Sequence, residues 1–439
     1  MGVYDAMNNA VGGLLAQSYA LQNISGNIAN SQTVGYKSVD TAFQDLLTTS
    51  GFTSATQNSG SVLARSVSNI SVQGNIVSSS VSTNMAIAGD GYFQVQAKAG
   101  ESDGATVLTG ANVYTRQGDF TMSKEGYLVN SAGYYLTGIP VDSITGNITG
   151  SVSQPIKVDT GLIPAKQSTE IAYYGNLPSS SAVATIASAD FTSSAGYPGT
   201  IAAADNDTFL KESLSGGSVT CYDQQGNELN VQLRWARTAS NTWNCYYQSD
   251  SSATGTATQW TSLGSTFSFN ATGTRTAPVS DNITISNLTV DGTNIGNIKF
   301  SYGDNLTQYN SGTSVTENDV TQNGYASGKF TSLAVADGVV TATYSNGKKI
   351  DLFKVGIYTF NGDAELLALS GNAYSATKAS GNAILWTGAT INGSSLESSN
   401  VDITDQFSKM IVTQQAYSAN SKVISTANTM MQDVLDIVR

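Results

Sequence analysis

The chain has 439 residues and a net charge of −12, contains no histidine, and only 12% of its residues are charged. The absence of histidine removes the commonest general base, which argues against Ser/His/Asp and Cys/His mechanisms and most zinc sites. The acidic balance argues against nucleic acid or membrane insertion. The length suits roughly two to four domains, and the abundance of Gly, Ser, Thr and Asn is typical of β-rich secreted or surface assemblies.

Residues 1–32 carry apolar side chains at a seven-residue spacing. A period of seven keeps one stripe on one side of an α-helix and is typical of coiled coils. Asp5 is the only charged residue before Lys37, so we expect this helix to be covered by a partner. The stripe consists of Val3, Met7, Ala10, Leu14, Leu21, Ile24 and Ile28.

Residues 33–80 are polar and are predicted to form an extended connector, with a short helix near Val39 to Leu47. Residues 81–155 then change to a strand-like period. The segment 85–95 alternates on both sides of Gly89-Asp90-Gly91, which predicts a hairpin. Residues 113–138 predict three more short strands, with Tyr114, Phe120, Tyr127 and Tyr135 in a small β-core.

Residues 156–330 have turns every eight to twelve residues, as in a β-sandwich or barrel, and no helical period. Residues 331–400 return to the style of 81–155, with a hairpin through Asn346-Gly347. The chain runs from a helix through a β-region, a larger β-region and a second β-region to a final helix. This order predicts that each inner domain is inserted into the outer one and that the two ends of the chain meet. Cys221 and Cys245 either pair or remain as two half-buried thiols.

Residues 401–439 contain a second apolar stripe with a seven-residue period, and no Pro or Gly interrupts it. We expect the helix to begin at Thr404, whose hydroxyl accepts from the N–H of Phe407. Polar Gln414, Ser421 and Asn428 are predicted at inner positions, where they would fix the register. The apolar stripe is predicted to comprise Met410, Ile411, Tyr417, Ile424, Met431, Leu435 and Val438. The two terminal helices pair within the chain or with other copies.

Several motifs point weakly to chemistry. Residues 204–208 and 291–296 contain Asp, Asn and Gly, but neither has the spacing of a calcium loop, so turns are predicted. Asp363 and Glu365 are interpreted as solvated carboxylates. The tryptophans Trp235, Trp243 and Trp260 are expected in a core, although they could stack on sugars. We therefore predict no enzyme activity, cofactor or metal.

Four segments resemble the family of flagellar rod, hook and hook-associated proteins: NISGNIANSQTVGYKSVDTAF (23–43), QGNIVSSSVSTNMAIAGDGYFQV (73–95), YTRQGDFTMSKEGYLVNSAGYYLTG (114–138) and LESSNVDITDQFSKMIVTQQAYSANSKVI (396–424). They occur in the family's order and cover roughly half of the chain. Two departures are Ala88 and Gln415, where relatives carry Asp and Arg. The signature positions are Asn27, Ile28, Ala29, Asn30, Gly35, Tyr36, Lys37, Gly89, Asp90, Gly91, Ser399, Asn400, Val401 and Asp402.

The long segment 156–330 points to the hook branch of this family. The resemblance implies a hollow, flexible homopolymer that acts as a universal joint, with a terminal coiled-coil core formed by residues 1–32 and 401–439. It also implies contacts with a rod protein, a junction protein and a hook cap. Export would use the flagellar type III apparatus to an extracellular location, which agrees with the absence of a basic secretory signal.

Two alternatives stay open at this point. The first is a distal rod or hook-associated junction protein, which differs in the straightness and length of its polymer. The second is a secreted β-rich adhesin or carbohydrate-binding protein whose central domain does the work.

Overall fold

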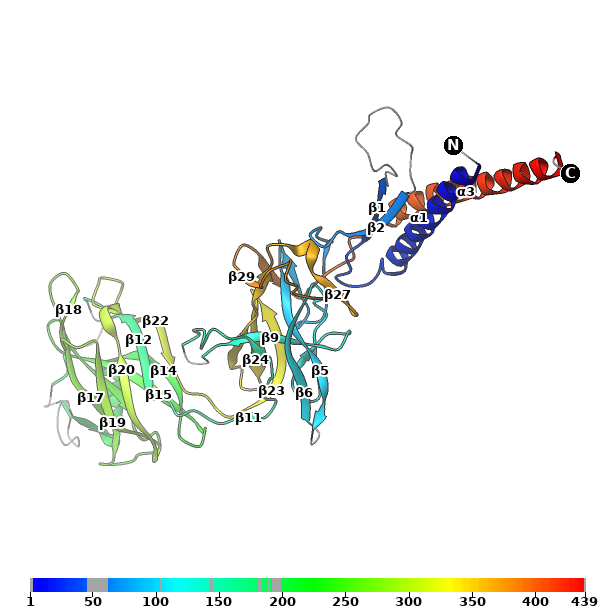
Figure 1. Cartoon of the computed structure of the whole chain (residues 1–439). Coiled ribbons are helices and arrows are strands. Elements are labelled where there is room, and N and C mark those ends of the chain that lie inside the picture. The colour runs from blue at the N-terminus through cyan, green and yellow to red at the C-terminus, as the bar shows by residue number, and fades with distance from the viewer. Residues whose placement is uncertain are drawn as a thin grey trace. The chain divides into compact units, whose positions relative to one another are not determined.

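The computed structural model describes residues 3–45, 62–102, 105–142, 145–180, 184–187, 190–191 and 199–437. The chain is mainly β with a long helix near each end, as the sequence predicts (Figure 1). It divides into two compact units. Unit 1 comprises Met1–Thr160, Thr331–Thr343 and Lys349–Arg439, and unit 2 comprises Gly161–Phe330 and Tyr344–Lys348.

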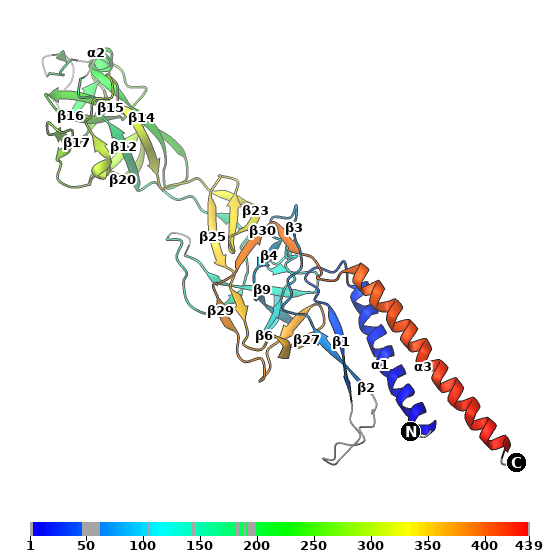
Figure 2. The ribbon, with the colours of Figure 1, turned by 90° about the horizontal axis from the view of Figure 1, so that it is seen from above.

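Helices α1 (Val3–Ala29) and α3 (Ile403–Ile437) lie side by side in unit 1 and run antiparallel (Figure 2). The expected start of the second helix at Thr404 is wrong by one residue. The capping group is the carboxylate of Asp402, whose Oδ1 accepts from the backbone N–H of Thr404 at 2.8 Å and of Asp405 at 3.2 Å. A carboxylate there also offsets the positive end of the helix dipole.

The short helix expected near Val39 to Leu47 is wrong. Residues Val39–Asp45 form strand β1, which pairs antiparallel with β2 (Val62–Ser68) into a ribbon against α1. Leu46 and Leu47 lie outside the described residues. The side chain of Asn23 on α1 donates to Thr41 Oγ1 at 2.9 Å and to Ser66 Oγ at 3.0 Å. These bonds to a neighbouring helix favour the extended ribbon over a local helix.

The remaining strands that lie mainly in unit 1 form a large sheet and two short pairs. The sheet has the order β11-β23-β24-β25-β9-β5-β6-β28-β27, with β7, β8, β10, β26 and β29 attached off this path. The short pairs are β3 with β31 and β4 with β30. The bounds are β3 Ile76–Ser78, β4 Met85–Ala88, β5 Tyr92–Ser102, β6 Ala105–Thr115, β7 Thr121–Met122, β8 Leu128–Val129, β9 Tyr134–Pro140, β10 Gln154–Pro155, β23 Gly328–Ala336, β24 Val339–Tyr344, β25 Lys349–Lys354, β26 Ile357–Thr359, β27 Leu367–Leu369, β28 Ala373–Ser375, β29 Ile384–Trp386, β30 Thr390–Gly393 and β31 Ser395–Glu397.

The hairpin expected over residues 85–95 is wrong, although both of its strands exist. Strand β4 pairs with β30, while β5 pairs with β6, β9 and β26. The turn between β4 and β5 moves the chain from one sheet to another. Gly89 and Gly91 have φ values of 107° and 122°, a region that side chains with a Cβ rarely adopt.

The segment 113–138 forms short strands as expected, but it contributes to four, β6, β7, β8 and β9, instead of three. The expected hairpin through Asn346-Gly347 is confirmed, since β24 and β25 pair there with Gly347 at φ 77°. Tyr114, Phe120 and Tyr135 are buried, and the Tyr127 ring packs edge-on against Tyr135 with centroids 5.6 Å apart. The aromatic spacing therefore predicted core positions correctly.

Unit 2 contains two sheets whose side chains share one core. One sheet has the order β19-β20-β12-β21 with β22 on β12, and the other has the order β13-β17-β16-β15-β14 with β18 on β17. The expectation of no helix in this segment is wrong, because α2 (Asn206–Glu212) buries Phe209 against Tyr246 and Trp260. The bounds are β11 Leu162–Ile163, β12 Glu170–Asn176, β13 Thr200–Ala202, β14 Ser213–Tyr222, β15 Glu228–Ala239, β16 Thr242–Gln248, β17 Thr258–Phe269, β18 Arg275–Ala277, β19 Asn282–Val290, β20 Thr293–Ser301, β21 Leu306–Thr307 and β22 Thr316–Gln322.

The open questions about cysteine and tryptophan have clear answers. Cys221 and Cys245 are both buried and free. Trp235, Trp243 and Trp260 are at most 2% exposed. These tryptophans form core and cannot stack on an external sugar.

We predict that Trp235→Ala destabilises unit 2 by about 3–5 kcal/mol, because Trp235 is fully buried against Phe267 and donates Nε1–H to Tyr173. The matched control is Trp386→Ala, whose side chain is 43% exposed. Urea unfolding of the full chain is the measurement. Equal losses of stability in the two variants would show that the core described for unit 2 is wrong.

Candidate functional site: the terminal helices and their junction

The seam between α1 and α3 is built from small and polar side chains. On α1 the buried positions include Ala10, Gly13, Ala20 and Ile24. A Cβ at Gly13 would lie 2.7 Å from the Asn420 amide nitrogen, so the two helices approach closely at that point. The facing residues of α3 recur every seven positions and are Gln406, Thr413, Asn420 and Ala427. The most buried positions of the helix pair are therefore mostly small or polar, with Ile24 as the large apolar exception.

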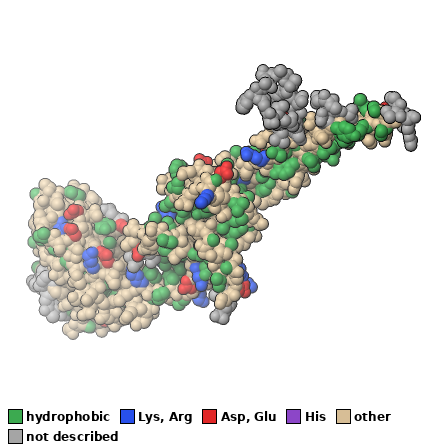
Figure 3. All heavy atoms as spheres, in the orientation of Figure 1, with side chains coloured by type: hydrophobic (Ala, Val, Ile, Leu, Met, Phe, Trp, Pro, Cys, Tyr) green, Lys and Arg blue, Asp and Glu red, His purple; other side chains and the backbone are tan. Residues whose placement is uncertain are grey.

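Large apolar side chains lie on the outer faces of the same helices. Leu15 is 69% exposed, Val412 66% and Leu435 67%. Isolated exposed apolar residues are ordinary, but a continuous set along two helices marks an interaction surface. Figure 3 shows hydrophobic side chains running along the visible face of the helix pair. The set is Tyr4, Val11, Leu15 and Tyr19 on α1 and Ile403, Phe407, Ile411, Val412, Tyr417, Val423, Met430, Val434 and Leu435 on α3.

An open apolar groove of about 620 Å³ lies where the N-terminal end of α1 meets the C-terminal end of α3. Tyr4 lines it from α1, and Met430, Met431, Val434 and Leu435 line it from α3. Among the lining residues that the structure describes, Asp433 is the only charged one. The groove continues the exposed apolar surface to the end of the helix pair.

Some of the predicted stripe residues are buried or half-buried in the helix pair, and others are exposed on its outer faces. Ala10 and Ile24 are buried, and Met7, Leu14, Leu21, Ile28, Met410, Ile424 and Met431 are half-buried. Ile411, Tyr417 and Leu435 are exposed. Val3 lies in α1, and Val438 lies outside the described residues.

The predicted inner polar positions do not lie in the seam with α1, and their place against other copies stays a prediction. Gln414, Ser421 and Asn428 are exposed, and the polar seam lies at Gln406, Thr413 and Asn420 instead. Apolar residues in α3 occur as adjacent pairs, such as Val423-Ile424 and Met430-Met431. The seven-residue period therefore does not determine which residue of each pair faces α1. The missed signal is the seven-residue repeat of Gln406, Thr413, Asn420 and Ala427.

The family signature residues meet where the helices join the β-strands. Asn27 is fully buried; its amide donates to Val39 O at 2.9 Å and to Gln406 Oε1 at 3.1 Å. Asn400 Oδ1 accepts from the Ser38 N–H at 2.7 Å. One network thus ties the end of α1, the ribbon and the start of α3 together.

A buried ion triad lies at the same junction. The Glu397 carboxylate accepts from Lys37 Nζ at 2.6 Å and from Arg116 Nη1 at 3.1 Å. All three side chains are at most 3% exposed. Burial lowers the pKa of the Lys37 ammonium, and the negative charge of Glu397 opposes that shift. Lys37 was singled out from the sequence, whereas Glu397 and Arg116 lie in quoted motifs but were not.

The Gly-Asp-Gly and Asp402 signatures have separate local roles. Gly89 and Gly91 shape the turn after β4, and Asp402 caps α3. Gly35 has φ 66° and its N–H donates to Glu397 O at 2.8 Å. Asn30 and Ser31 bond the last carbonyls of α1, through Gly26 O and Ile28 O.

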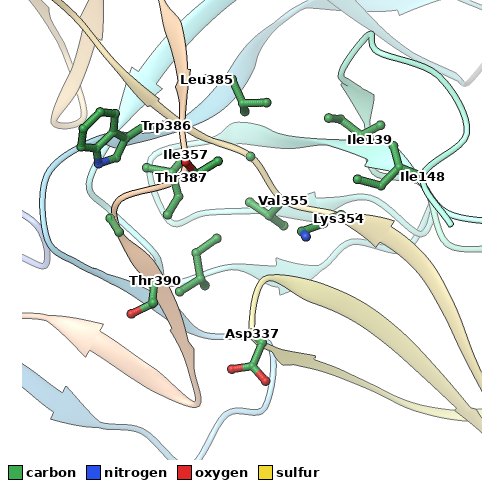
Figure 4. A pocket seen from close by; sticks show the side chains of 13 residues that line it. Ile139, Ile148, Asp337, Lys354, Val355, Ile357, Leu385, Trp386, Thr387 and Thr390 are labelled. Atoms are coloured by element: carbon green, nitrogen blue, oxygen red, sulfur yellow. The ribbon is translucent and has the colours of Figure 1, made fainter. Parts of the chain in front are cut away.

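A second groove, of about 360 Å³, lies among the β-strands of unit 1 and is largely apolar. Figure 4 shows Ile139, Ile148 and Leu385 around it, together with Trp386. The charged residues in the described part of its lining are Asp337 and Lys354. This groove does not bring together a nucleophile, a base and an oxyanion donor.

The remaining motifs are structural. Asp205 lies at the start of α2, and Asp291 and Gly292 form the turn between β19 and β20. Within the described ranges, no three His, Cys, Asp or Glu residues are grouped to hold a metal. Asp363 is half-buried, not solvated as expected, and burial raises its pKa. None of the helices described here has the length and hydropathy to span a bilayer.

Three family models match the chain. They describe the flagellar basal body rod FlgEFG C-terminal region over residues 393–437, the flagellar basal body protein FlaE D2 domain over 192–325, and the flagellar hook protein FlgE/F/G D1 domain over 86–176. Segments from both units thus match the same class. The class is that of flagellar rod and hook proteins.

Relatives of full length narrow this class. The flagellar hook protein FlgE of Brucella suis biovar 1 (strain 1330) is 30% identical over 453 residues, with 100% of both chains covered. The FlgE of Escherichia coli (strain K12) is 28% identical, with 98% of this chain and 100% of the relative covered. The chain belongs to the flagellar hook protein FlgE family and is a structural subunit of the hook.

A solved structure supports the fold. The crystal structure of Helicobacter pylori flagellar hook protein FlgE2 has a TM-score of 0.50 and 16% sequence identity to this chain. It covers 73% of this chain, and 100% of the H. pylori chain is covered. With the relatives above, the predicted family is confirmed, and the family is one of structural proteins and not an enzyme family.

The junction also predicts a pH dependence through Asp40, which pairs with Lys409 at 3.1 Å. Burial raises the pKa of Asp40, but hydrogen bonds from Asn69 and Lys409 outweigh it and lower the pKa below its ordinary value. The pair then stabilises the fold at pH values above the ordinary carboxyl pKa, and this stabilisation is lost as the pH falls through the folded-state pKa.

Asp40→Asn should therefore lower the free energy of unfolding at neutral pH by less than about 1 kcal/mol, because the pair is partly exposed. The melting temperature should fall slightly as a result. The difference from the original chain should disappear in acid. Thermal melts across the acidic range measure it. A difference that persists at pH values below the folded-state pKa would contradict this assignment.

Proposed function

We propose that the chain polymerises through its terminal helices into a hollow, flexible tube that acts as a universal joint between the rod and the filament. Residues 1–32 and 401–439 form a coiled-coil inner core in this proposal. Residues 33–80 connect it to an inner β-domain of 81–155 and 331–400, and residues 156–330 form an outer domain of the sandwich or barrel type. The observation that carries the proposal is the large apolar surface left on the outer faces of α1 and α3.

The energetics of that surface favour association. Burying a Leu, Ile, Val or Phe side chain contributes about 1.5–3 kcal/mol, so even a few such side chains per neighbour offset the ordering cost of assembly. A polymer requires a head-to-tail contact that does not close on itself. The exposed apolar residues follow one face of α1 but occupy several faces of α3, which suits contacts with more than one neighbour.

The outer domain has a different task in this proposal. A joint that bends while turning compresses and extends its outer contacts in every turn, so these contacts must slide. The surface of unit 2 is rich in Ser, Thr and Asn. Polar, hydrated contacts exchange partners at low cost, whereas apolar packing resists sliding.

The proposed partners follow from membership of the hook family. They are further copies of the chain, a rod protein at the proximal end, a junction protein at the distal end and a hook cap during assembly. The proposed route is export through the flagellar type III apparatus to an extracellular position in the hook.

The first test introduces a charge on the outer face of a helix. Ile411→Asp and Leu15→Asp should reduce sedimentable polymer at least about tenfold, because a buried unpaired carboxylate opposes association. Both side chains are exposed in the subunit, so its melting temperature should change little. Thr109→Asp, at an exposed polar position of β6 and on neither helix, is the control and should still polymerise.

Electron microscopy and sedimentation of the purified variants are the readouts. Normal tubes from Ile411→Asp and Leu15→Asp would remove the outer helix faces from the proposed interface.

A second test follows the helices during assembly. The seam between α1 and α3 is small and polar, so we predict that it holds the helices weakly in a dilute subunit. Circular dichroism should show a gain of helical signal as subunits polymerise, with backbone amides near both chain ends mobile in the monomer by NMR. Rigid terminal helices in the dilute monomer would contradict the prediction.

A further inference from the structure

The Lys37–Glu397–Arg116 triad lies at the point where both chain connections leave the helix pair. Lys37 follows α1 and precedes β1, and Glu397 ends β31 shortly before α3 begins. Arg116 follows β6 of the large sheet. Lys37 and Glu397 are 360 positions apart in sequence, and Arg116 and Glu397 are 281 apart. A single carboxylate therefore joins the two connections to the sheet.

Both oxygens of the Glu397 carboxylate have partners. Oε1 accepts from Lys37 Nζ at 2.6 Å and from the Gly74 N–H at 2.8 Å, and Oε2 accepts from Arg116 Nη1 at 3.1 Å. Such complete pairing is what makes burial of an ion tolerable. The carboxylate thus fixes three separate segments in one place.

Both cations are also held by backbone oxygens. Lys37 Nζ donates to Val72 O at 2.6 Å, and Arg116 Nη2 donates to Gly89 O at 2.7 Å. The Arg116 guanidinium lies 5.7 Å from the centre of the Tyr92 ring in the sheet core. The triad consequently reaches from the helix connections into the turn after β4 and the core around β5.

Tight backbone packing surrounds the triad. A Cβ at Gly74 would lie 2.0 Å from Ser398 O, and one at Gly35 would lie 2.8 Å from the backbone of Arg116. The Gly35 N–H donates to Glu397 O at 2.8 Å, and the Asn400 N–H donates to Tyr36 O at 3.3 Å. The two connections are therefore hydrogen-bonded to each other beside the carboxylate.

We propose that Glu397 is the positioning residue that holds the junction ends of α1 and α3 in a fixed place on the β-strands of unit 1, acting through Lys37 and Arg116, while the far ends of both helices stay mobile in the monomer. The joint makes the inner helices and these strands a single mechanical body within each subunit. Bending of the polymer then takes place between copies and not inside this junction. This mechanical role rests on the proposed function, whereas the positioning role concerns the subunit alone.

The charges predict how strongly substitutions at Glu397 and Lys37 loosen the junction relative to each other. Loss of side-chain packing alone would not predict the same order. Glu397→Gln keeps the shape of the side chain but leaves two buried cations without an anion. Lys37→Met removes one cation and leaves Glu397 paired with Arg116, so its effect should be smaller. In Lys37→Met/Glu397→Gln only one cation is uncompensated, so the double variant should be closer to the original chain than Glu397→Gln is.

Hydrogen exchange of the full-length monomer tests this order. Glu397→Gln should speed exchange at least about tenfold at the amides of Gly35, Ser38 and Gly74, while amides of β5 and β6 stay protected. The control is Glu101→Gln, which removes the anion of an exposed pair with Lys98 in the same unit and should change none of these amides.

Three results would overturn the proposal. They are unchanged exchange in Glu397→Gln, an equal increase throughout β5 and β6, and an effect of Lys37→Met as large as that of Glu397→Gln. Polymerisation of the unsubstituted chain is measured in a separate experiment. A chain that does not polymerise but shows the expected order of exchange would contradict the proposed function and leave the positioning role intact.

Discussion

The packing between α1 and α3 is the constraint on which the proposed assembly depends. Close approach at Gly13 and Asn420 brings the backbones together, and small residues such as Ala20 line the seam. The most buried positions of the helix pair are mostly small or polar, and bulky apolar residues such as Leu15 and Val412 remain exposed outside the seam. A subunit built in this way is only partly covered by its own fold. Further copies of the chain supply the missing cover in the proposed polymer.

The junction below the helices complements this design. A helix pair that is held weakly can transmit force only if it is anchored to the β-strands. A buried ion with complete hydrogen bonding is such an anchor, because moving it away from its partners would leave a buried charge unpaired. The Glu397 carboxylate, whose two oxygens both have partners, provides such an anchor within unit 1, and the buried neutral amide of Asn27 adds hydrogen bonds beside it. Unit 2 has its own core around residues such as Trp235 and Phe267, so it is stabilised by contacts that the helices do not share.

The sequence predicted the terminal helices, the family and most turns, because heptad spacing and glycine-containing turns are local signals. It did not predict which neighbours the elements choose. Strand β4 pairs with β30 far along the chain, and no local pattern encodes that choice. The seven-residue period predicted two helices but not which residues of α3 face α1. Either residue of an adjacent apolar pair fits a heptad pattern equally well. The role of Glu397 was hidden because its two cations come from distant segments.

Oxidative footprinting of the helix side chains in monomer and polymer provides a decisive comparison. Leu15, Phe407 and Met430 are exposed in the subunit and lie on the outer faces of the helix pair. If neighbouring copies cover these faces, hydroxyl-radical labelling of all three should fall at least about tenfold on assembly, as expected when exposed side chains become interface core. Equal labelling in monomer and polymer would show that the helices do not form the contacts between copies.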